Sequence, residues 1–94
     1  MTKQSANWSL YIIEANDASL YTGISTDVER RFEEHRSGAR GARYFNGREP
    51  RRILYREDGH SRASASRREA EIKKMSRSAK QQLIASASLR QESG

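Results

Sequence analysis

Apolar residues along the chain fall into short groups whose spacing predicts a small mixed domain. Between residues 8 and 14, tryptophan, leucine and isoleucine at even positions alternate with tyrosine and isoleucine at odd positions. This period of two is typical of a strand with apolar residues on both faces. Residues 15–19 have the length and composition of a hairpin turn. Residues 20–24 then form a second strand, in which Gly23 marks a close approach to the backbone.

After the second strand the pattern becomes helical. Thr26 and Glu29 have the spacing of a capping box, and Asp27 suits the positive end of a helix that begins at Thr26. Apolar residues then recur one turn apart, and Gly38 is a natural stop signal. A first helix is therefore expected between Thr26 and Gly38.

The second half of the chain predicts one more strand and two more helices, each with its own cap or turn signal. In order, we expect a strand over residues 52–57, a turn at Asp58 and Gly59, a helix that Ser61 or Ser64 caps and that reaches about Met75, and a helix over residues 77–85 that Ser76 caps. The expected apolar contacts of the second helix are Ala65, Ala70, Ile72 and Met75.

This order of elements predicts an α+β fold. A three-stranded, largely antiparallel sheet would be flanked by helices in the order β-β-α-β-α-α. A chain of 94 residues has room for one domain, which we place at residues 8–85. Residues 1–7 and 86–94 have little to bury, so a flexible N-terminus and a flexible C-terminal tail are expected.

Composition narrows the class of protein. The chain has no cysteine, which excludes disulfides, thiol catalysis and thiolate zinc sites. It has no apolar run long enough to span a membrane, and its polar start lacks the apolar core of a secretory signal. A cytoplasmic protein without a membrane partner is therefore expected.

Charge is concentrated in one segment. Between Arg36 and Arg56 there are seven arginines and one acid, so this segment carries the whole net charge of +6. Arginine suits phosphate groups, and glycines and aromatic residues lie among these arginines, so the segment is a candidate nucleic-acid contact whose target could be DNA, RNA or another polyanion. The alternative is a solvated basic loop. The candidate nucleic-acid-binding residues are Arg36, Arg40, Arg43, Tyr44 and Arg48.

Five residues could provide catalytic chemistry, although no common catalytic motif is present. Tyr11 and Tyr21 lie on the two strands of the expected hairpin, so their rings can share a neighbourhood. Arg31 and His35 share one face of the first helix. Glu69 is a carboxylate in the middle of the second helix. Together these groups could bind a divalent metal ion, neutralise phosphate charge and orient water for phosphodiester hydrolysis.

Four stretches of the sequence resemble the GIY-YIG endonuclease superfamily, and the resemblance covers about residues 8–83. It is closest to the small, stand-alone, YhbQ-like branch. The matching stretches are Ser9-Leu10-Tyr11, Tyr21-Thr22-Gly23, residues 26–35 with their aspartate, arginine and histidine, and Glu69 followed by Ile72-Lys73-Lys74.

The resemblance implies a role for each candidate residue in an endonuclease that hydrolyses DNA. Tyr11 and Tyr21 would line the site, one of them as general base or as the group that orients the attacking water. Arg31 would contact the scissile phosphate, and His35 would assist through a hydrogen bond or a phosphate contact. Glu69 would ligate one Mg²⁺ or Mn²⁺ ion.

The sequence also departs from the family pattern. Ser9 replaces the first glycine, Thr22 is the middle residue of the second half-motif, and Ile24 replaces a lysine present in excision-repair relatives. An asparagine that many members carry late in the domain is missing, since Asn46 is the last one here. A phenol with an ordinary pKa near ~10 needs a nearby cation to act as a base. Reduced or selective activity is therefore expected.

Two other functions remain open from the sequence. One is a nucleic-acid-binding module that retains the nuclease fold without turnover, and the other is an interaction domain whose basic loop contacts an acidic protein. Retention of the tyrosines, Arg31 and Glu69 favours the nuclease. A small domain of this kind would depend on a partner protein or on DNA shape for its specificity.

Overall fold

A computed structural model of the chain describes residues 6–37 and 47–93. The expected α+β fold and the order of its elements are confirmed. The sheet has three strands in the order β2-β1-β3, and β1 pairs antiparallel with both neighbours. The elements are β1 (Trp8–Ala15), β2 (Leu20–Ser25), α1 (Val28–Ser37), β3 (Pro50–His60), α2 (Arg62–Lys73) and α3 (Arg77–Ser93).

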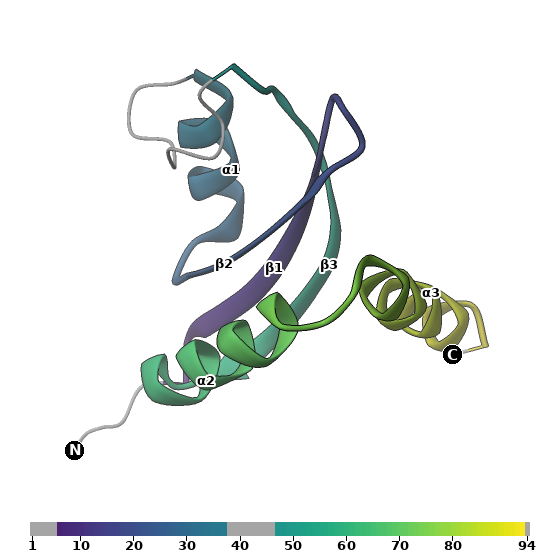
Figure 1. Cartoon of the computed structure of the whole chain (residues 1–94). Coiled ribbons are helices and arrows are strands. Elements are labelled where there is room, and N and C mark those ends of the chain that lie inside the picture. Colours follow the sequence, from purple (N-terminus) through teal and green to yellow (C-terminus); the bar gives the residue numbers. More distant parts are fainter. Residues whose placement is uncertain (1–5, 38–46, 94) are drawn as a thin grey trace.

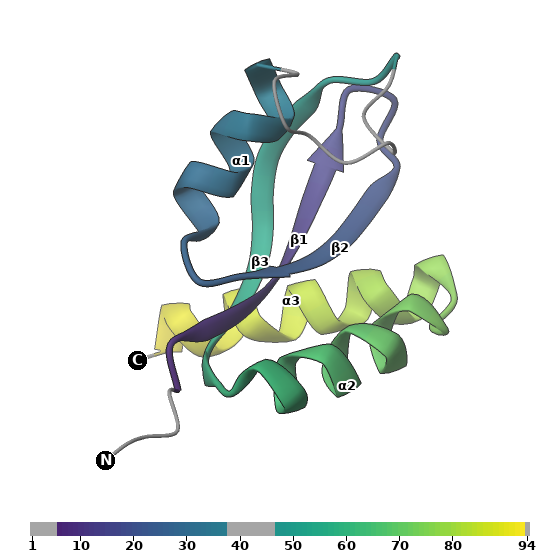
Figure 2. The same ribbon diagram turned by 90° about the vertical axis from the view of Figure 1, so that its left-hand side faces the viewer.

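The central strand β1 has helices against both of its faces (Figures 1 and 2). Its odd residues, such as Tyr11 and Ile13, pack with Val28 of α1. Its even residues, Leu10 and Ile12, pack with residues of α2 and α3. The two alternating apolar sets of β1 therefore form two small cores, as expected for a middle strand whose successive side chains point to opposite faces.

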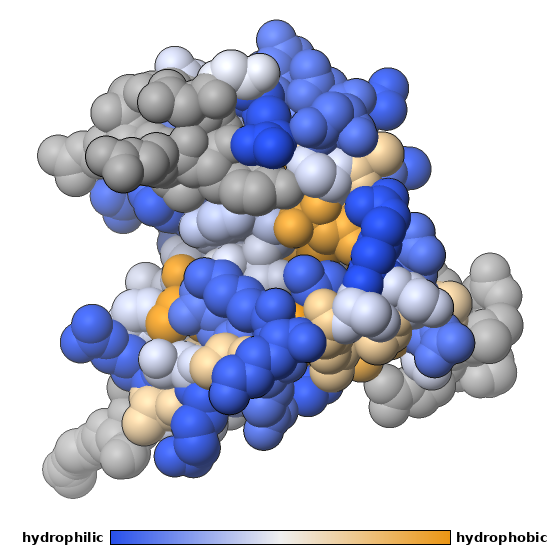
Figure 3. All heavy atoms as spheres, in the orientation of Figure 1, coloured by the Kyte–Doolittle hydropathy of each residue, from blue (hydrophilic) through white to orange (hydrophobic). Residues whose placement is uncertain are grey.

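The second core is incompletely covered. Figure 3 shows a mostly hydrophilic surface with an apolar area near the middle of this face. Several apolar side chains that pack against the second core remain only partly buried: Leu20, Ile24, Met75, Leu83, Ile84 and Ala87.

Within the described ranges, no helix is long and apolar enough to cross a membrane.

The first helix begins slightly later than its sequence predicts. The cap is Asp27 rather than Thr26, because the Asp27 carboxylate accepts the amide of Arg30 at 3.1 Å. The backbone carbonyl of Asp27 accepts the amide of Arg31 at 3.0 Å. The expected stop at Gly38 lies outside the described residues.

The predicted turn at Asp58 and Gly59 was wrong, because β3 continues through both residues to His60. Trp8 pairs with His60 and Leu10 pairs with Glu57, so β3 contains one extra residue there. Gly59 has a φ of +79°, which only glycine adopts readily. The glycine therefore allows a bulge in an edge strand instead of a turn.

Both candidate caps of α2 act together. Ser61 accepts the amide of Ser64 at 3.1 Å, and the Ser64 hydroxyl accepts the amide of Ser61 at 3.0 Å. Of the expected apolar contacts of α2, Ala65 and Ile72 are fully buried. Ala70 is exposed, which corrects its predicted inward position. Its side chain lies on the outer surface of the helix.

The third helix is longer than predicted. Ser76 caps it by accepting the amide of Ala79 at 3.1 Å, as expected. The expected end at Ala85 was wrong, because α3 continues to Ser93. No glycine or proline interrupts residues 86–93, and Ala87 packs against the second core. That the tail is flexible stays a prediction.

One buried hydroxyl gives a test of the second core. Thr22 pairs with Ile12, is 2% exposed, and its Oγ1 has no hydrogen-bond partner among the described residues. Thr22→Val removes an unsatisfied polar group with little change in shape. We expect the free energy of unfolding to rise by about 1 kcal/mol and the melting temperature by about 4–8 °C. Thermal denaturation measures this.

Ser9→Ala is the matched contrast, because the buried Ser9 hydroxyl donates to Asp58 at 2.6 Å. That change should lower the melting temperature. Equal destabilisation by both substitutions would contradict the assignment of Thr22 as unsatisfied.

Candidate active site

The hairpin brings Tyr11 and Tyr21 onto one face of the sheet. Tyr11 pairs directly with Gly23, and Tyr21 is the next residue of β2 on the same face. Their ring centres are 6.3 Å apart. A Cβ atom on Gly23 would lie 2.5 Å from the Tyr11 hydroxyl and 2.7 Å from its Cζ. Gly23 therefore provides the space that the Tyr11 phenol occupies, as the sequence predicts.

The helix α1 adds an imidazole and a guanidinium to this face. The Tyr11 hydroxyl lies 3.2 Å from Nε2 of His35, and the Tyr21 and His35 ring centres are 5.3 Å apart. The positive charge of Arg31, one turn before His35, acts on Tyr11 and opposes the rise of its pKa. The structure thus brings together four of the five candidate catalytic residues.

Burial determines the protonation of the inner pair. It raises the pKa of Tyr11, and the neighbouring Tyr21 raises it further. Burial also lowers the pKa of His35 to about 4, and the Arg31 charge contributes to this. At neutral pH the phenol is therefore protonated and the imidazole is neutral. The Tyr11 hydroxyl and Nε2 of the neutral His35 ring therefore share one buried hydrogen bond.

Tyr21 is the more accessible phenol, since it is only partly buried whereas Tyr11 is 1% exposed. Burial raises the pKa of Tyr21, although the charges of Lys73 and Arg31 oppose the shift. Tyr21 is therefore also protonated at neutral pH, and it is the phenol better placed to meet a substrate.

The carboxylate of Glu69 approaches the tyrosines from α2. Its charge raises the pKa of both Tyr11 and Tyr21, whereas Glu71 is not among the groups that shift either phenol. The Glu69 side chain is 22% exposed and lies 3.2 Å from Nζ of Lys73. Glu71, the other acid of α2, is 63% exposed and pairs with Arg68. The structure thus places Glu69, rather than Glu71, near the tyrosines.

The site offers one carboxylate rather than a preformed metal cage. In the part of the chain that the structure describes, no three histidine or acidic residues are grouped to hold a metal ion. Mg²⁺ commonly binds through one or two carboxylates and completes its shell with water and substrate phosphates. Glu69 fits a divalent ion of that kind.

A polar pocket of about 260 Å³ lies beside Arg31. The Arg31 guanidinium lines it and donates to Glu34 at 2.9 Å. Arg31 thus joins the buried Tyr11 to a solvent-accessible pocket, where a phosphate would compete with Glu34. The lining residues are Ser25, Thr26, Asp27, Arg30, Arg31 and Glu34.

The candidate nucleic-acid-binding residues are only partly described. Arg36 is exposed at the end of α1 and pairs with Glu33 at 2.8 Å. Arg48 pairs with Asp17 in the hairpin turn at 3.0 Å. The others, Arg40, Arg43 and Tyr44, lie outside the described residues.

Two acids that hold arginines were not predicted from the sequence: Glu34, beside the site, and Glu57, outside it. Glu34 follows Arg31 by one turn of α1, and this spacing could have indicated the ion pair. Glu57 receives Arg68 of α2 at 3.0 Å. No local spacing signals that contact, because the two residues belong to different elements.

Comparison with known proteins shows the family of this chain. The GIY-YIG catalytic domain matches residues 7–82. The chain therefore belongs to the GIY-YIG family, a superfamily of nucleases. The expected resemblance is confirmed.

The similar proteins belong to a small stand-alone group. The UPF0213 protein DP2720 of Desulfotalea psychrophila is 46% identical over 77 residues, which cover 82% of this chain and 70% of that protein. The UPF0213 protein HQ_3675A of Haloquadratum walsbyi is 50% identical over 79% of this chain and 82% of its own. The solution structure of the UPF0213 protein BH0048 from Bacillus halodurans is 44% identical, covers 83% of this chain and 82% of its own, and has a TM-score of 0.53.

The low pKa of His35 makes stability depend on pH. Unfolding returns this pKa from about 4 to an ordinary 6.5, so the unfolded chain binds the extra proton between these values. The stabilisation is complete above pH 6.5 and is lost as the pH falls toward 4, by at most about 1.4 kcal/mol per pH unit. Urea denaturation between about pH 7 and pH 5, above the range of most carboxyl groups, measures this slope. His35→Gln should flatten it, and an unchanged slope would contradict the assignment.

Gly23→Ala tests the packing of Tyr11. The added methyl group must displace the phenol, so we expect a loss of about 1–3 kcal/mol of stability and a rise of the His35 pKa toward its ordinary value. Histidine proton NMR during a pH titration measures the second effect. Gly59→Ala is the control, because it strains a positive φ but meets no neighbouring atom within 4 Å. If both variants leave the His35 titration unchanged, Tyr11 does not determine it.

Proposed function

We propose that this protein is a divalent-metal-dependent endonuclease that hydrolyses DNA phosphodiester bonds. The observation that carries the proposal is the convergence of two phenols, an imidazole, a guanidinium and a carboxylate in one small region. Membership of a nuclease superfamily supports the same chemistry. The residues concerned are Tyr11, Tyr21, Arg31, His35 and Glu69.

Arg31 would bind the scissile phosphate. Arg31 lines the polar pocket, and its guanidinium is oriented by Glu34 at 2.9 Å. A planar, oriented donor suits phosphate oxygens and stabilises the charge that grows on them in the transition state. His35 would act through Tyr11, because its neutral ring fixes the direction of the Tyr11 hydroxyl.

The phenols would orient groups rather than take protons. Both are protonated at neutral pH, and the Tyr11 hydroxyl is already occupied by His35. We assign Tyr21, the accessible phenol, to orient the water that attacks phosphorus. That attack forms one P–O bond, breaks the bond to the leaving oxygen and transfers a proton to it.

Glu69 would hold one Mg²⁺ or Mn²⁺ ion. Such an ion, when bound, lowers the pKa of its water and neutralises phosphate charge. To bind the ion, the Glu69 carboxylate must give up its contact with Nζ of Lys73. The DNA backbone would continue toward the basic segment, in which Arg36 and Arg48 are the candidate contacts that the structure describes. A partner protein or a particular DNA structure would supply further specificity, and the cytoplasm is the expected location.

The Glu69→Ala variant tests this function. Cleavage of duplex, flapped, branched and single-stranded DNA is measured with Mg²⁺ or Mn²⁺. We expect the wild-type protein to cleave at least one of these DNA structures. The cleavage rate of Glu69→Ala should be lower by at least about 100-fold, because loss of a direct metal ligand costs more than loss of a residue that only contacts such a ligand. DNA binding without metal should persist or tighten, because the variant removes a negative charge.

Glu71→Ala is the matched control, since it removes the same charge from the exposed side of the same helix. It should retain most of the cleavage rate. A wild type that binds DNA and cleaves none of these structures would favour a nucleic-acid-binding module without turnover. Equal rates for wild type and Glu69→Ala would contradict the metal role of Glu69.

A further inference from the structure

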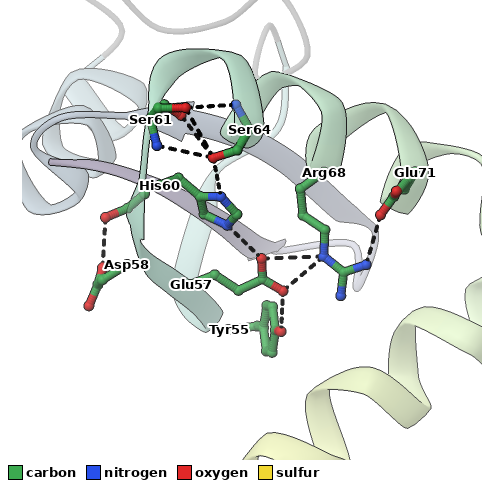
Figure 4. Close-up of polar contacts among 9 residues, drawn as sticks. Tyr55, Glu57, Asp58, His60, Ser61, Ser64, Arg68 and Glu71 are labelled. Carbon is green, nitrogen blue, oxygen red and sulfur yellow. Dashed lines mark hydrogen bonds and ion pairs between the residues drawn. The ribbon is translucent and has the colours of Figure 1, made fainter. Parts of the chain in front are cut away.

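A polar network joins the end of β3 to α2, outside the candidate active site (Figure 4). Its centre is the carboxylate of Glu57, which accepts the Tyr55 hydroxyl at 2.5 Å. Nε of Arg68 donates to both Glu57 oxygens, at 3.0 and 3.3 Å. Nε2 of His60 lies 2.9 Å from the same carboxylate. Glu57 therefore connects its own strand to the middle of the helix.

The network also includes the beginning of α2. Nδ1 of His60 lies 2.8 Å from the hydroxyl of Ser64. Serine, histidine and glutamate are the residue types of a hydrolytic triad, but the Ser64 oxygen already accepts the Ser61 amide at 3.0 Å in the capping box. The network is therefore structural, and both ring nitrogens of His60 take part in it.

The network is well shielded and charged. The side chains of Glu57 and His60 are each 20% exposed, and that of Arg68 is 28% exposed. Burial opposes ionisation of Glu57, but its hydrogen bonds from Tyr55, His60 and Arg68 outweigh this and lower its pKa. Glu57 and Arg68 thus form an ion pair at neutral pH that water reaches only partly, so its geometry is well defined.

Apolar packing alone fixes the rotation of α2 about its axis only weakly. Of its twelve residues, only Ala65 and Ile72 are buried. Alanine is small, and Ala70, on the outer surface, makes no core contact. An additional polar contact between α2 and the sheet is therefore needed to hold one orientation.

We propose that Glu57 and Arg68 are positioning residues that orient Glu69 toward the tyrosine pair. Arg68 precedes Glu69 directly, and successive residues of an α-helix are separated by about 100° around the axis. Because Glu57 holds Arg68 against β3, the direction of Glu69 follows from that contact. The inference rests on the proposed role of Glu69 as a metal ligand.

The test compares the metal dependence of Glu57→Gln with that of wild type. Glutamine keeps the shape of Glu57 but loses its charge, so its hold on Arg68 weakens. We expect the Mn²⁺ concentration for half-maximal DNA cleavage to rise about ten-fold. This is the lower end of the loss in metal affinity that follows when a residue that orients a metal ligand is removed. Excess Mn²⁺ should restore most of the rate, and metal-free DNA binding should change no more than in the control.

The control is Glu29→Gln, the same chemical change at an exposed position outside both α2 and the basic segment. Its Mn²⁺ dependence should equal that of wild type. Arg68→Lys is the second variant, which keeps the positive charge but not the paired contacts with Glu57. It should also raise the Mn²⁺ concentration that half-maximal cleavage requires. If Glu57→Gln does not fold, Arg68→Lys provides the test in its place.

A measurement without catalysis provides the second readout. Mn²⁺ added to the protein alone broadens NMR signals of residues near the bound ion. In wild type we expect broadening around Glu69 and across to Tyr21, and in Glu57→Gln the same broadening should need more Mn²⁺. A folded Glu57→Gln with wild-type Mn²⁺ dependence in both experiments would overturn the positioning role alone. Absence of cleavage and of broadening in wild type would overturn the proposed function and this inference together.

Discussion

The hydroxyl of Tyr11 lies where a side chain at position 23 would be, and much of the candidate site depends on this contact. Glycine at that position leaves room for the phenol to extend along the sheet. There it meets the ring of His35, so one buried hydroxyl connects the central strand to the first helix. The positive charge of Arg31, which lines the polar pocket, acts on the same phenol. The Tyr11 hydroxyl, which helps to hold α1 against the sheet, is therefore also part of the candidate active site.

A small domain with two thin cores depends strongly on polar contacts between its elements. In the first core, α1 contributes both apolar side chains and the buried imidazole of His35. On the other side, α2 buries only two side chains and is held further by Glu57 and Arg68. In this fold the orientation of each functional helix is determined by hydrogen bonds as much as by apolar burial.

The sequence predicts what local patterns determine. The alternation in β1, the caps of α2 and α3 and the close approach at Gly23 are all features of neighbouring residues. The longer reach of β3 and α3 and the partners of His60 depend on contacts between distant segments. Gly59, for example, resembles a turn residue, but pairing with β1 keeps it within a bulged strand. The shared face of Arg31 and His35 was predictable from helical spacing, whereas the contact between Glu57 and Arg68 was not.

The central claim is that one site combines an oriented arginine, a protonated pair of tyrosines and the carboxylate of Glu69. The most direct test is a crystal structure with Mn²⁺ and a non-cleavable phosphorothioate DNA, in which anomalous scattering locates the ion. The account predicts the ion at Glu69, with a phosphate oxygen bound to it and the same phosphate contacting Arg31. An ion or a phosphate bound away from these residues would contradict the account.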